Sequence, residues 1–379
     1  MSFSFVVIGF SLFTWGIGEG MFLYFVPLYL QQLGAAPLMI GTVYSAFGFA
    51  MLLAHIPAGY LSDKLGRRPL IRAAWIMGLI ATWVMALGPS LEIFIAGFVL
   101  YGVTGFVSSP LFSYVTAARG KLTAGRAMTL TSAMYNLGAV LGPVSGGWIG
   151  EQFGIRTIFT YAAIIFVVST ALVMFLKPQS RDLQDDENTT RKLLTNTRFL
   201  SYLGMIFLVM FALYLPQTLT PNFLQNQRGI TLGQMGTIGS LGNLGNVVFN
   251  LVLGHFSTGL GFALGQVCVA LFAFLIWKGT GQPWYMLAYF LMGGFRAARM
   301  LAMAQVRLII HQSQMGLAYG MTEAGNSIAM ILSPLLAGYL YDQDPASIYP
   351  LSLLLITIGI IISLIFAPRE KRQTVKETI

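Results

Sequence analysis

The strongest constraint on this chain is its series of long apolar runs, which carry few charges. Of the 379 residues, 56% are hydrophobic and 9% are charged, whereas a soluble domain of this length needs far more polar surface. A bilayer core about 30 Å thick requires roughly 20 apolar residues per helix. Twelve such runs lie near 4–31, 38–61, 69–88, 91–117, 127–149, 155–177, 199–224, 232–257, 262–280, 284–309, 319–341 and 347–367. The sequence therefore predicts an all-α polytopic membrane protein with twelve transmembrane helices, the first of them retained rather than cleaved as a signal peptide.

The positive charges indicate how the chain is oriented. If both termini and every loop that follows an even-numbered run are placed in the cytoplasm, that side receives 17 of the 22 lysines and arginines. Arg156, Arg228 and Lys278 fall on the other side, and Arg296 and Arg299 lie inside a run. The positive-inside rule therefore predicts cytoplasmic termini. We expect an integral protein of a bacterial inner (plasma) membrane, whose excess of +9 charges reflects orientation and contact with lipids rather than a nucleic-acid surface.

The two halves of the chain resemble each other. "PLYLQQLG" from Pro27 aligns with "PNFLQNQRG" from Pro221, "IGTVYS" from Ile40 with "MGTIGS" from Met235, and "GPVSGGWI" from Gly142 with "SPLLAGYL" from Ser333. Between the halves lies the most polar stretch of the sequence. These observations predict an N-terminal six-helix bundle (1–177), a cytoplasmic linker (178–198) and a C-terminal six-helix bundle (199–379). Such repeats are typical of transporters that hold substrate near the midplane, between bundles that rock alternately.

The turn between the second and third runs has the form G-x-x-x-D-x-x-G-R-R. It consists of Gly59, Asp63, Gly66, Arg67 and Arg68. With the repeat, this turn resembles the major facilitator superfamily of secondary transporters, and the likeness covers essentially the whole chain. The resemblance implies a cytoplasmic latch between the bundles that favours the outward-open state. The alternative is that the arginines only obey the positive-inside rule.

A second motif lies in the fifth run and consists of Gly138, Gly142, Pro143, Gly146 and Gly147. It is similar to the motif of exporters in that superfamily, chiefly proton-coupled drug antiporters. The alternative is a packing face of small residues, with no bearing on the direction of transport. One departure stands out, because Gly97 occupies the place where those antiporters carry an arginine in helix four. The proton relay of that family therefore does not transfer to this chain.

Ionisable residues inside apolar runs are costly, and they mark candidate functional positions. Glu19 shares a helical stripe with Trp15, and Glu323 shares one with Asn326. A carboxyl group in an apolar setting suits a proton carrier. The resemblance implies that both glutamates lie near the substrate, because helices one, four, seven and ten of the family line the cavity, with five, eight and eleven beside them. The alternative for each is a packing hydrogen bond or a fixed ion pair.

Other polar residues inside the runs are candidates for substrate binding. Arg296 and Arg299 lie on one stripe of the tenth run. They could hold an anionic group or neutralise one of the glutamates, and one of them could instead extend toward the cytoplasm. Asn243 heads a polar stripe in the eighth run, which interhelical hydrogen bonds explain about as well as substrate contact does.

These features predict a secondary active transporter. We expect proton-coupled export of amphipathic organic molecules by a monomer in contact with membrane lipids, driven by a proton gradient and without a cofactor or a metal. A phosphate-binding loop, a metal-ligand cluster and a nucleophile–base pair are all missing from the sequence, so an enzyme is not expected. The alternatives are an importer, a flippase for lipids or organic anions, and a receptor that does not transport.

Overall fold

The computed structural model describes the backbone of residues 2–179, 196–310 and 315–366, and the side chains of these residues except 55–65, 109, 124–125 and 315–317. Every regular element in these ranges is a helix. Those of the first half are α1 (Phe3–Leu23), α2 (Val26–Gln32), α3 (Pro37–Leu65), α4 (Arg67–Leu87), α5 (Leu91–Val103), the 3-10 turn η1 (Thr104–Val107), α6 (Ser108–Ala118), α7 (Ala124–Phe153) and α8 (Ile155–Met174). Those of the second half are α10 (Thr197–Tyr214), α11 (Thr220–Arg228), α12 (Leu232–Leu253), α13 (Thr258–Lys278), α14 (Gln282–Met292), α15 (Gly294–Val306), α16 (Met315–Gln343) and α17 (Ile348–Phe366).

The predicted all-α membrane fold is confirmed. Seven of the described helices are each long and apolar enough to cross a membrane, namely α1, α3, α4, α8, α10, α13 and α17. The segments of α5 and α6 are long and apolar enough together, with a bend of 45° between them. Residues 180–195 of the predicted linker lie outside the described ranges. The boundaries of the linker and of the two halves therefore stay a prediction.

The first and fourth spans of each half are interrupted, which the apolar runs did not predict. The first span breaks between α1 and α2, beside Pro27, and its counterpart breaks between α10 and α11, beside Pro216 and Pro221. The fourth spans break at η1, just before Pro110, and at Gly293. Proline and paired glycines are the usual causes of such kinks.

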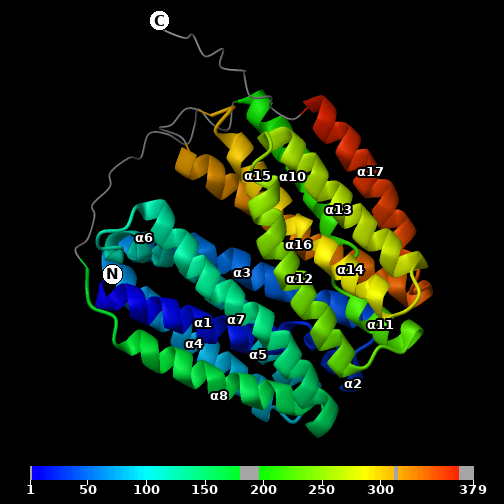
Figure 1. Cartoon of the computed structure of the whole chain (residues 1–379), viewed down its shortest axis with the longest axis horizontal. Coiled ribbons are helices and arrows are strands. Elements are labelled where there is room, and N and C mark those ends of the chain that lie inside the picture. The colour runs from blue at the N-terminus through cyan, green and yellow to red at the C-terminus, as the bar shows by residue number, and fades with distance from the viewer. Residues whose placement is uncertain (1, 180–195, 311–314, 367–379) are drawn as a thin grey trace, which may run out of the picture.

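The helices form two bundles, α1 to α8 and α10 to α17, which meet chiefly through α3 with α16, α7 with α12, and α2 with α11. Figure 1 shows that the bundles lie side by side near α2 and α11 and diverge toward the N-terminus. We call the end that carries Gly66, Lys177 and Asn196 the linker side. The opposite side carries the tight turns at Gly34 and Gly229, both of which have positive φ.

Two of these contacts repeat each other. The Ser45 hydroxyl on α3 donates to the carbonyl oxygen of Ile331 on α16 at 2.5 Å, and the Ser240 hydroxyl on α12 donates to that of Val140 on α7 at 2.6 Å. Ser45 and Ser240 hold the same position in the two aligned segments. The repeat therefore builds an interface with approximate two-fold symmetry, as expected for two bundles related by an axis along the membrane normal.

Glycines bring the backbones together at the same two places. Gly41 lies against the backbone of Pro334, and Gly236, its repeat partner, lies against the backbone of Pro143. A side chain at either glycine would collide with that backbone, so small residues permit the close approach. The segments that match between the two halves of the sequence therefore form contacts between the two bundles.

Hydrogen bonds close the opposite side. The Asn222 amide on α11 donates to the Pro27 carbonyl at 3.0 Å and to Gln31 on α2 at 2.6 Å. The Glu151 carboxylate at the end of α7 accepts from the Thr231 hydroxyl at 2.9 Å and from the Gly233 amide at 2.5 Å, at the start of α12. A carboxylate is favoured at a helix N-terminus. We call this contact the Glu151 clasp.

Candidate functional site

The site is centred on Glu19, which lies deep in α1. One of its carboxylate oxygens accepts from the Trp15 indole nitrogen at 3.0 Å and from the Tyr135 hydroxyl on α7 at 3.0 Å. The Tyr101 hydroxyl of α5 is a further hydrogen-bond partner. Three helices of the first bundle therefore hold this carboxyl group. Their neutral hydrogen-bond donors offset part of the cost of removing it from water.

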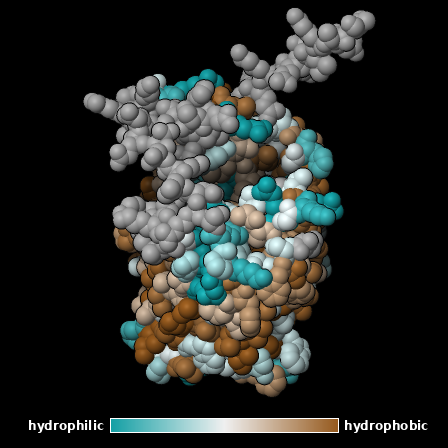
Figure 2. Space-filling view, turned by 90° about the vertical axis from the view of Figure 1, so that its left-hand side faces the viewer, coloured by the Kyte–Doolittle hydropathy of each residue, from teal (hydrophilic) through white to brown (hydrophobic). Residues whose placement is uncertain are grey.

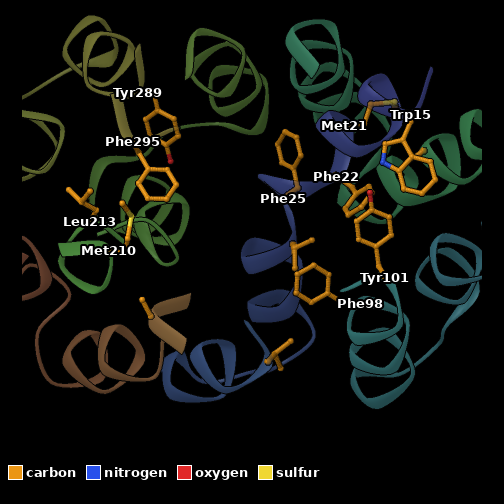
Figure 3. Packing of buried hydrophobic residues seen from close by; sticks show 14 of the residues in the cluster. Trp15, Met21, Phe22, Phe25, Phe98, Tyr101, Met210, Leu213, Tyr289 and Phe295 are labelled. Atoms are coloured by element: carbon orange, nitrogen blue, oxygen red, sulfur yellow. The ribbon is translucent and has the colours of Figure 1, made fainter. Parts of the chain in front are cut away.

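An aromatic cluster holds Trp15 in place. Its ring lies 4.7 Å from that of Trp75 and 4.5 Å from that of Phe166, and it stacks on Tyr101 at 6.0 Å. Figure 3 shows Trp15 and Tyr101 beside Phe22 in the first bundle, and other members of the same hydrophobic cluster, such as Tyr289 and Phe295, in the second bundle. The indole thus has a fixed orientation toward Glu19.

The second bundle contributes Arg296, on α15. Its side chain is exposed although it lies midway along a span, so water reaches the space between the bundles. Seen from the left of Figure 1, the molecule is hollowed above a group of hydrophilic residues (Figure 2). Arg296 lies close enough to Tyr135 to interact with its hydroxyl, and its charge acts on Glu19 and Tyr24. The Tyr135 hydroxyl donates to the acid of one bundle and faces the guanidinium of the other, from which a hydroxyl can also accept.

Arg299 lies one turn farther along α15 and belongs to a separate pair. It contacts Glu323 on α16 at 2.5 Å, and the two side chains are 30% and 38% exposed. Tyr214 lies close enough to interact with both charges. Among the alternatives that the sequence left open, Arg299 is placed to neutralise Glu323, and Arg296 faces Glu19 through Tyr135.

Asn243 and Asn326 lie in different surroundings. The Asn243 amide donates to the Ala139 carbonyl on α7 at 2.5 Å, so it joins the two bundles. The Tyr24 hydroxyl lies 3.4 Å from its oxygen. Asn326 is 2% exposed, and neither polar atom of its amide has a hydrogen-bond partner among the described residues.

The predicted latch turn lies on the linker side, away from Glu19. Gly66 has φ 85°, and Arg67 begins α4 directly after it. Gly59 and Asp63 belong to α3, but their side chains lie outside the described residues. Arg68 carries a buried Nε with no partner among the described residues. The latch role stays a prediction.

The glycines of the second motif serve two interfaces. Gly138, Gly142 and Gly146 face the backbone of α1, where a side chain would collide with it. Gly147 instead faces Gly236 on α12, and Pro143 touches both neighbours. The structure thus shows packing within one bundle and between the bundles. The link to the direction of transport stays a prediction.

Close packing around Gly97 leaves no room for an arginine at this position of the fourth span. A side chain built on it would meet Met85 at 2.8 Å and the Ala81 carbonyl at 3.0 Å on α4. One turn later, Tyr101 reaches Glu19 instead.

Sequence reasoning missed Tyr101 and Tyr135. Tyrosine is ordinary in a membrane helix, and only the position of Tyr135 three residues before Gly138 could have drawn notice. In the described part of the chain, no three histidine, cysteine, aspartate or glutamate side chains form a group that could bind a metal.

Comparisons with known proteins agree with this architecture. The family model described as Major Facilitator Superfamily matches residues 8–261. Multidrug resistance protein 2 of Bacillus subtilis (strain 168) is 22% identical over 358 residues, which cover 90% of this chain and 89% of that protein. Quinolone resistance protein NorA of Staphylococcus aureus (strain COL) is 22% identical, with 98% of each chain covered.

Two solved structures share the fold. The nucleoside transporter NupG matches with a TM-score of 0.79 and 15% identity, covering 96% of this chain and 98% of that one. The peptide transporter POT matches with a TM-score of 0.77 and 14% identity, covering 97% and 95%. Family, fold and apolar spans together show that this chain is an integral membrane protein and belongs to the major facilitator superfamily of transporters.

Proposed function

We propose that the protein exports amphipathic organic molecules in exchange for protons, by alternating access. One observation carries the proposal: Tyr135 lies between the half-buried carboxyl group of Glu19 in one bundle and Arg296 in the other. If Glu19 gains or loses a proton, a contact between the two helix bundles changes. The relatives named for multidrug and quinolone resistance support the direction and the substrate class.

The exchange follows from competition at Glu19. As a carboxylate, Glu19 attracts a positively charged group, and Arg296 supplies that group when the site is empty of substrate. A cationic substrate would compete with Arg296, and a proton would remove the charge that attracts either of them. Proton and substrate therefore favour different states of one site, which is the requirement for coupled exchange.

The arrangement of the bundles fits the loading step. The hydrogen bonds between the Asn222 amide and α2, with the Glu151 clasp, close the opposite side, while the bundles diverge toward the linker side (Figure 1). If the linker side is cytoplasmic, as the charge distribution predicts, this state takes up substrate from the cytoplasm. Transport then requires the opposite side to open.

Proteoliposomes with an imposed pH gradient test the proposal. Ethidium, a permanent cation, and a fluoroquinolone are added, and dissipation of the gradient is followed with a dye inside the vesicles. We expect substrate-dependent proton flux in the native protein and a loss of about tenfold or more in Glu19→Gln, because a charged hydrogen-bonded group is removed. Glu92→Gln is the matched control, since Glu92 is an exposed carboxylate at the start of α5.

The outcomes separate the parts of the proposal. Equal flux in Glu19→Gln and the native protein would remove Glu19 from the coupling. Substrate movement without proton movement would instead indicate a uniporter or a carrier coupled to another ion. Uptake driven in the opposite direction would favour an importer.

A further inference from the structure

Tyr24 reaches from the first bundle to the second at the break between α1 and α2. Its ring lies against Gly239 on α12, where an added Cβ would meet three ring carbons at 2.9–3.1 Å. An added Cβ on Gly242 would meet the Tyr24 hydroxyl oxygen at 3.3 Å. These two glycines leave a recess on the side of α12, which we call the Gly239 notch, and the Tyr24 ring occupies it.

The glycines of α12 differ in what they face. Gly236 and Gly245 lie against the backbone of neighbouring helices, so they allow those helices to approach closely. The three heavy atoms nearest to an added Cβ on Gly239 all belong to the Tyr24 ring instead. Close approach of helices therefore does not account for Gly239, whereas accommodation of the Tyr24 ring does.

The sequence repeat lacks this notch in the first half. In the aligned segments, Tyr44 stands in the place of Gly239, and Thr218 stands in the place of Tyr24. The large and the small residue are thus exchanged between the two halves. Because the related interface forms without a ring in a glycine recess, packing of the bundles alone does not require this contact.

Tyr24 lies between the central site and the closed side of the molecule. It follows Glu19 by five residues, or about 7.5 Å of helix, toward the opposite side. The charge of Arg296 acts on it. Three residues farther on, the Pro27 carbonyl accepts the hydrogen bond from Asn222 that helps to close the opposite side. The half-buried side chain therefore separates the central site from the contacts that close this side.

We propose that Tyr24 is the inner gate of the transport path. While its ring occupies the Gly239 notch, it blocks passage from the Glu19 site to the opposite side. Because Tyr24 moves with the first bundle and Gly239 with the second, the ring must leave the notch when the opposite side opens. The contact therefore stabilises the state that opens toward the linker side. This gate rests on the alternating access of the proposed function, and it requires neither the substrate class nor the coupling to protons.

Distances between spin labels at positions 92 and 280 measure opening of the opposite side, because Glu92 and Thr280 are exposed there on different bundles. The labels are placed in Cys268→Ala in detergent, with neither substrate nor a pH gradient. We expect Tyr24→Ala to lower the ratio of closed to open forms about fivefold, since part of the burial of one aromatic ring is lost. Tyr24→Phe should retain most of the closed form, because the ring stays and only the 3.4 Å contact of the hydroxyl with Asn243 is lost.

A double-mutant cycle tests the contact itself. Gly239→Ala should lower the ratio by a similar factor, because the added methyl group displaces the ring. In Tyr24→Ala the same methyl group meets no ring, so the double variant should behave like Tyr24→Ala alone. Gly204→Ala on α10 is the matched control, since nothing lies within 4 Å of its added Cβ.

The readout does not involve transport, so a failure of proton-coupled export in proteoliposomes would leave the gate standing. Additive effects of Tyr24→Ala and Gly239→Ala would overturn it, because the ring and the notch would then act independently. A loss in Tyr24→Phe as large as that in Tyr24→Ala would overturn the role of the ring. Size-exclusion profiles that match the native protein confirm that each variant is folded.

Discussion

Tyr135 is the residue on which the proposed coupling depends. Its hydroxyl donates to Glu19 and faces Arg296, and it lies on α7, one of the helices that pack against the second bundle. A hydroxyl both donates and accepts, so it can serve a carboxylate and a guanidinium at once. A change at this position therefore affects the acid and the contact between the bundles together.

Tyr135→Phe should uncouple proton movement from substrate movement. The ring stays and the hydroxyl is lost, so Glu19 loses a donor and Arg296 loses its partner across the interface. We expect substrate-driven proton flux to fall by about tenfold, since a hydrogen bond to a charged group contributes about 1.5–3 kcal/mol. Tyr161→Phe, at a tyrosine that is 44% exposed on α8, controls for loss of a hydroxyl. Unchanged flux in Tyr135→Phe would show that the hydroxyl does not link the two charges.

The pair of Arg299 and Glu323 calls for a different test, because it lies within one bundle. Its side chains are 30% and 38% exposed, and water screens such pairs, so we expect a coupling energy of about 1 kcal/mol or less. A double-mutant cycle with Arg299→Gln and Glu323→Gln, read by thermal unfolding in detergent, measures it. A coupling energy of several kcal/mol would instead identify a structural pair that holds α15 to α16.

The candidate site was partly predictable from the sequence. Glu19 and Arg296 stand out because a charge inside an apolar run is costly and requires a reason. Their relation was not predictable, since it depends on Tyr135, whose side chain is unremarkable in a membrane helix. The pairing of Arg299 with Glu323 was one of several possibilities, because a stripe on one helix does not determine which neighbour it faces.

At the scale of elements, α7 divides its glycines between two tasks. Gly138, Gly142 and Gly146 allow α1 to pack closely, and Gly147 allows α12 to cross from the other bundle. The first contact stays within a rigid body, and the second must change when the bundles rock. The same motif therefore contributes both to stability and to the conformational balance.

Gly142→Ala should lower stability. An added methyl group would collide with the backbone of Ile17 and Gly20, and overpacking of this kind costs about 1–3 kcal/mol. Thermal unfolding in detergent measures the loss. Gly204→Ala on α10 is the matched control, because nothing lies within 4 Å of its added Cβ, and alanine there should be neutral or slightly stabilising. Equal effects at the two positions would argue against the close packing of α1 and α7.

The elements themselves were predicted unevenly. Seven of the spans, and the bent pair of α5 and α6, follow from hydrophobic length, because the bilayer imposes it. The breaks in the first and fourth spans of each half do not, because a proline or a glycine pair kinks some membrane helices and is tolerated in others. Pro143 lies inside the unbroken α7, whereas Pro216 lies at the break between α10 and α11.

For the whole molecule, the approximate two-fold interface makes departures from symmetry informative. Glu151 clasps the start of α12. Its repeat partner is Asp342 on α16, by the alignment that pairs Gly142 with Ser333. Asp342 is exposed and makes no hydrogen bond with the described residues. In the other half the position of Thr231 is occupied by Ala36, which has no hydroxyl to donate. The clasp is therefore one-sided, and so is the predicted latch at Asp63, because the matching turn "GHFSTGLG" from Gly254 carries no aspartate or arginine.

A clasp and a latch at opposite ends should shift the conformational balance in opposite directions. Glu151→Gln removes a charge that closes the opposite side, so the state that opens toward the linker side should lose population. Asp63→Asn weakens the predicted latch on the linker side, so that state should gain population. Each change removes about 1 kcal/mol of helix-end or ion-pair stabilisation, which corresponds to about a fivefold shift in the ratio of the two states.

Distances between spin labels at positions 126 and 307 report this ratio, because Arg126 and Arg307 are exposed on the linker side of different bundles. The labels require a Cys268→Ala background, since Cys268 is the only cysteine. Asp342→Asn should leave the distribution unchanged and serves as the matched control. If Glu151→Gln and Asp63→Asn moved the distribution in the same direction, the two contacts would not be opposing locks. A shift in Glu151→Gln alone would retain the clasp and return the charged turn at Asp63 to a marker of membrane orientation.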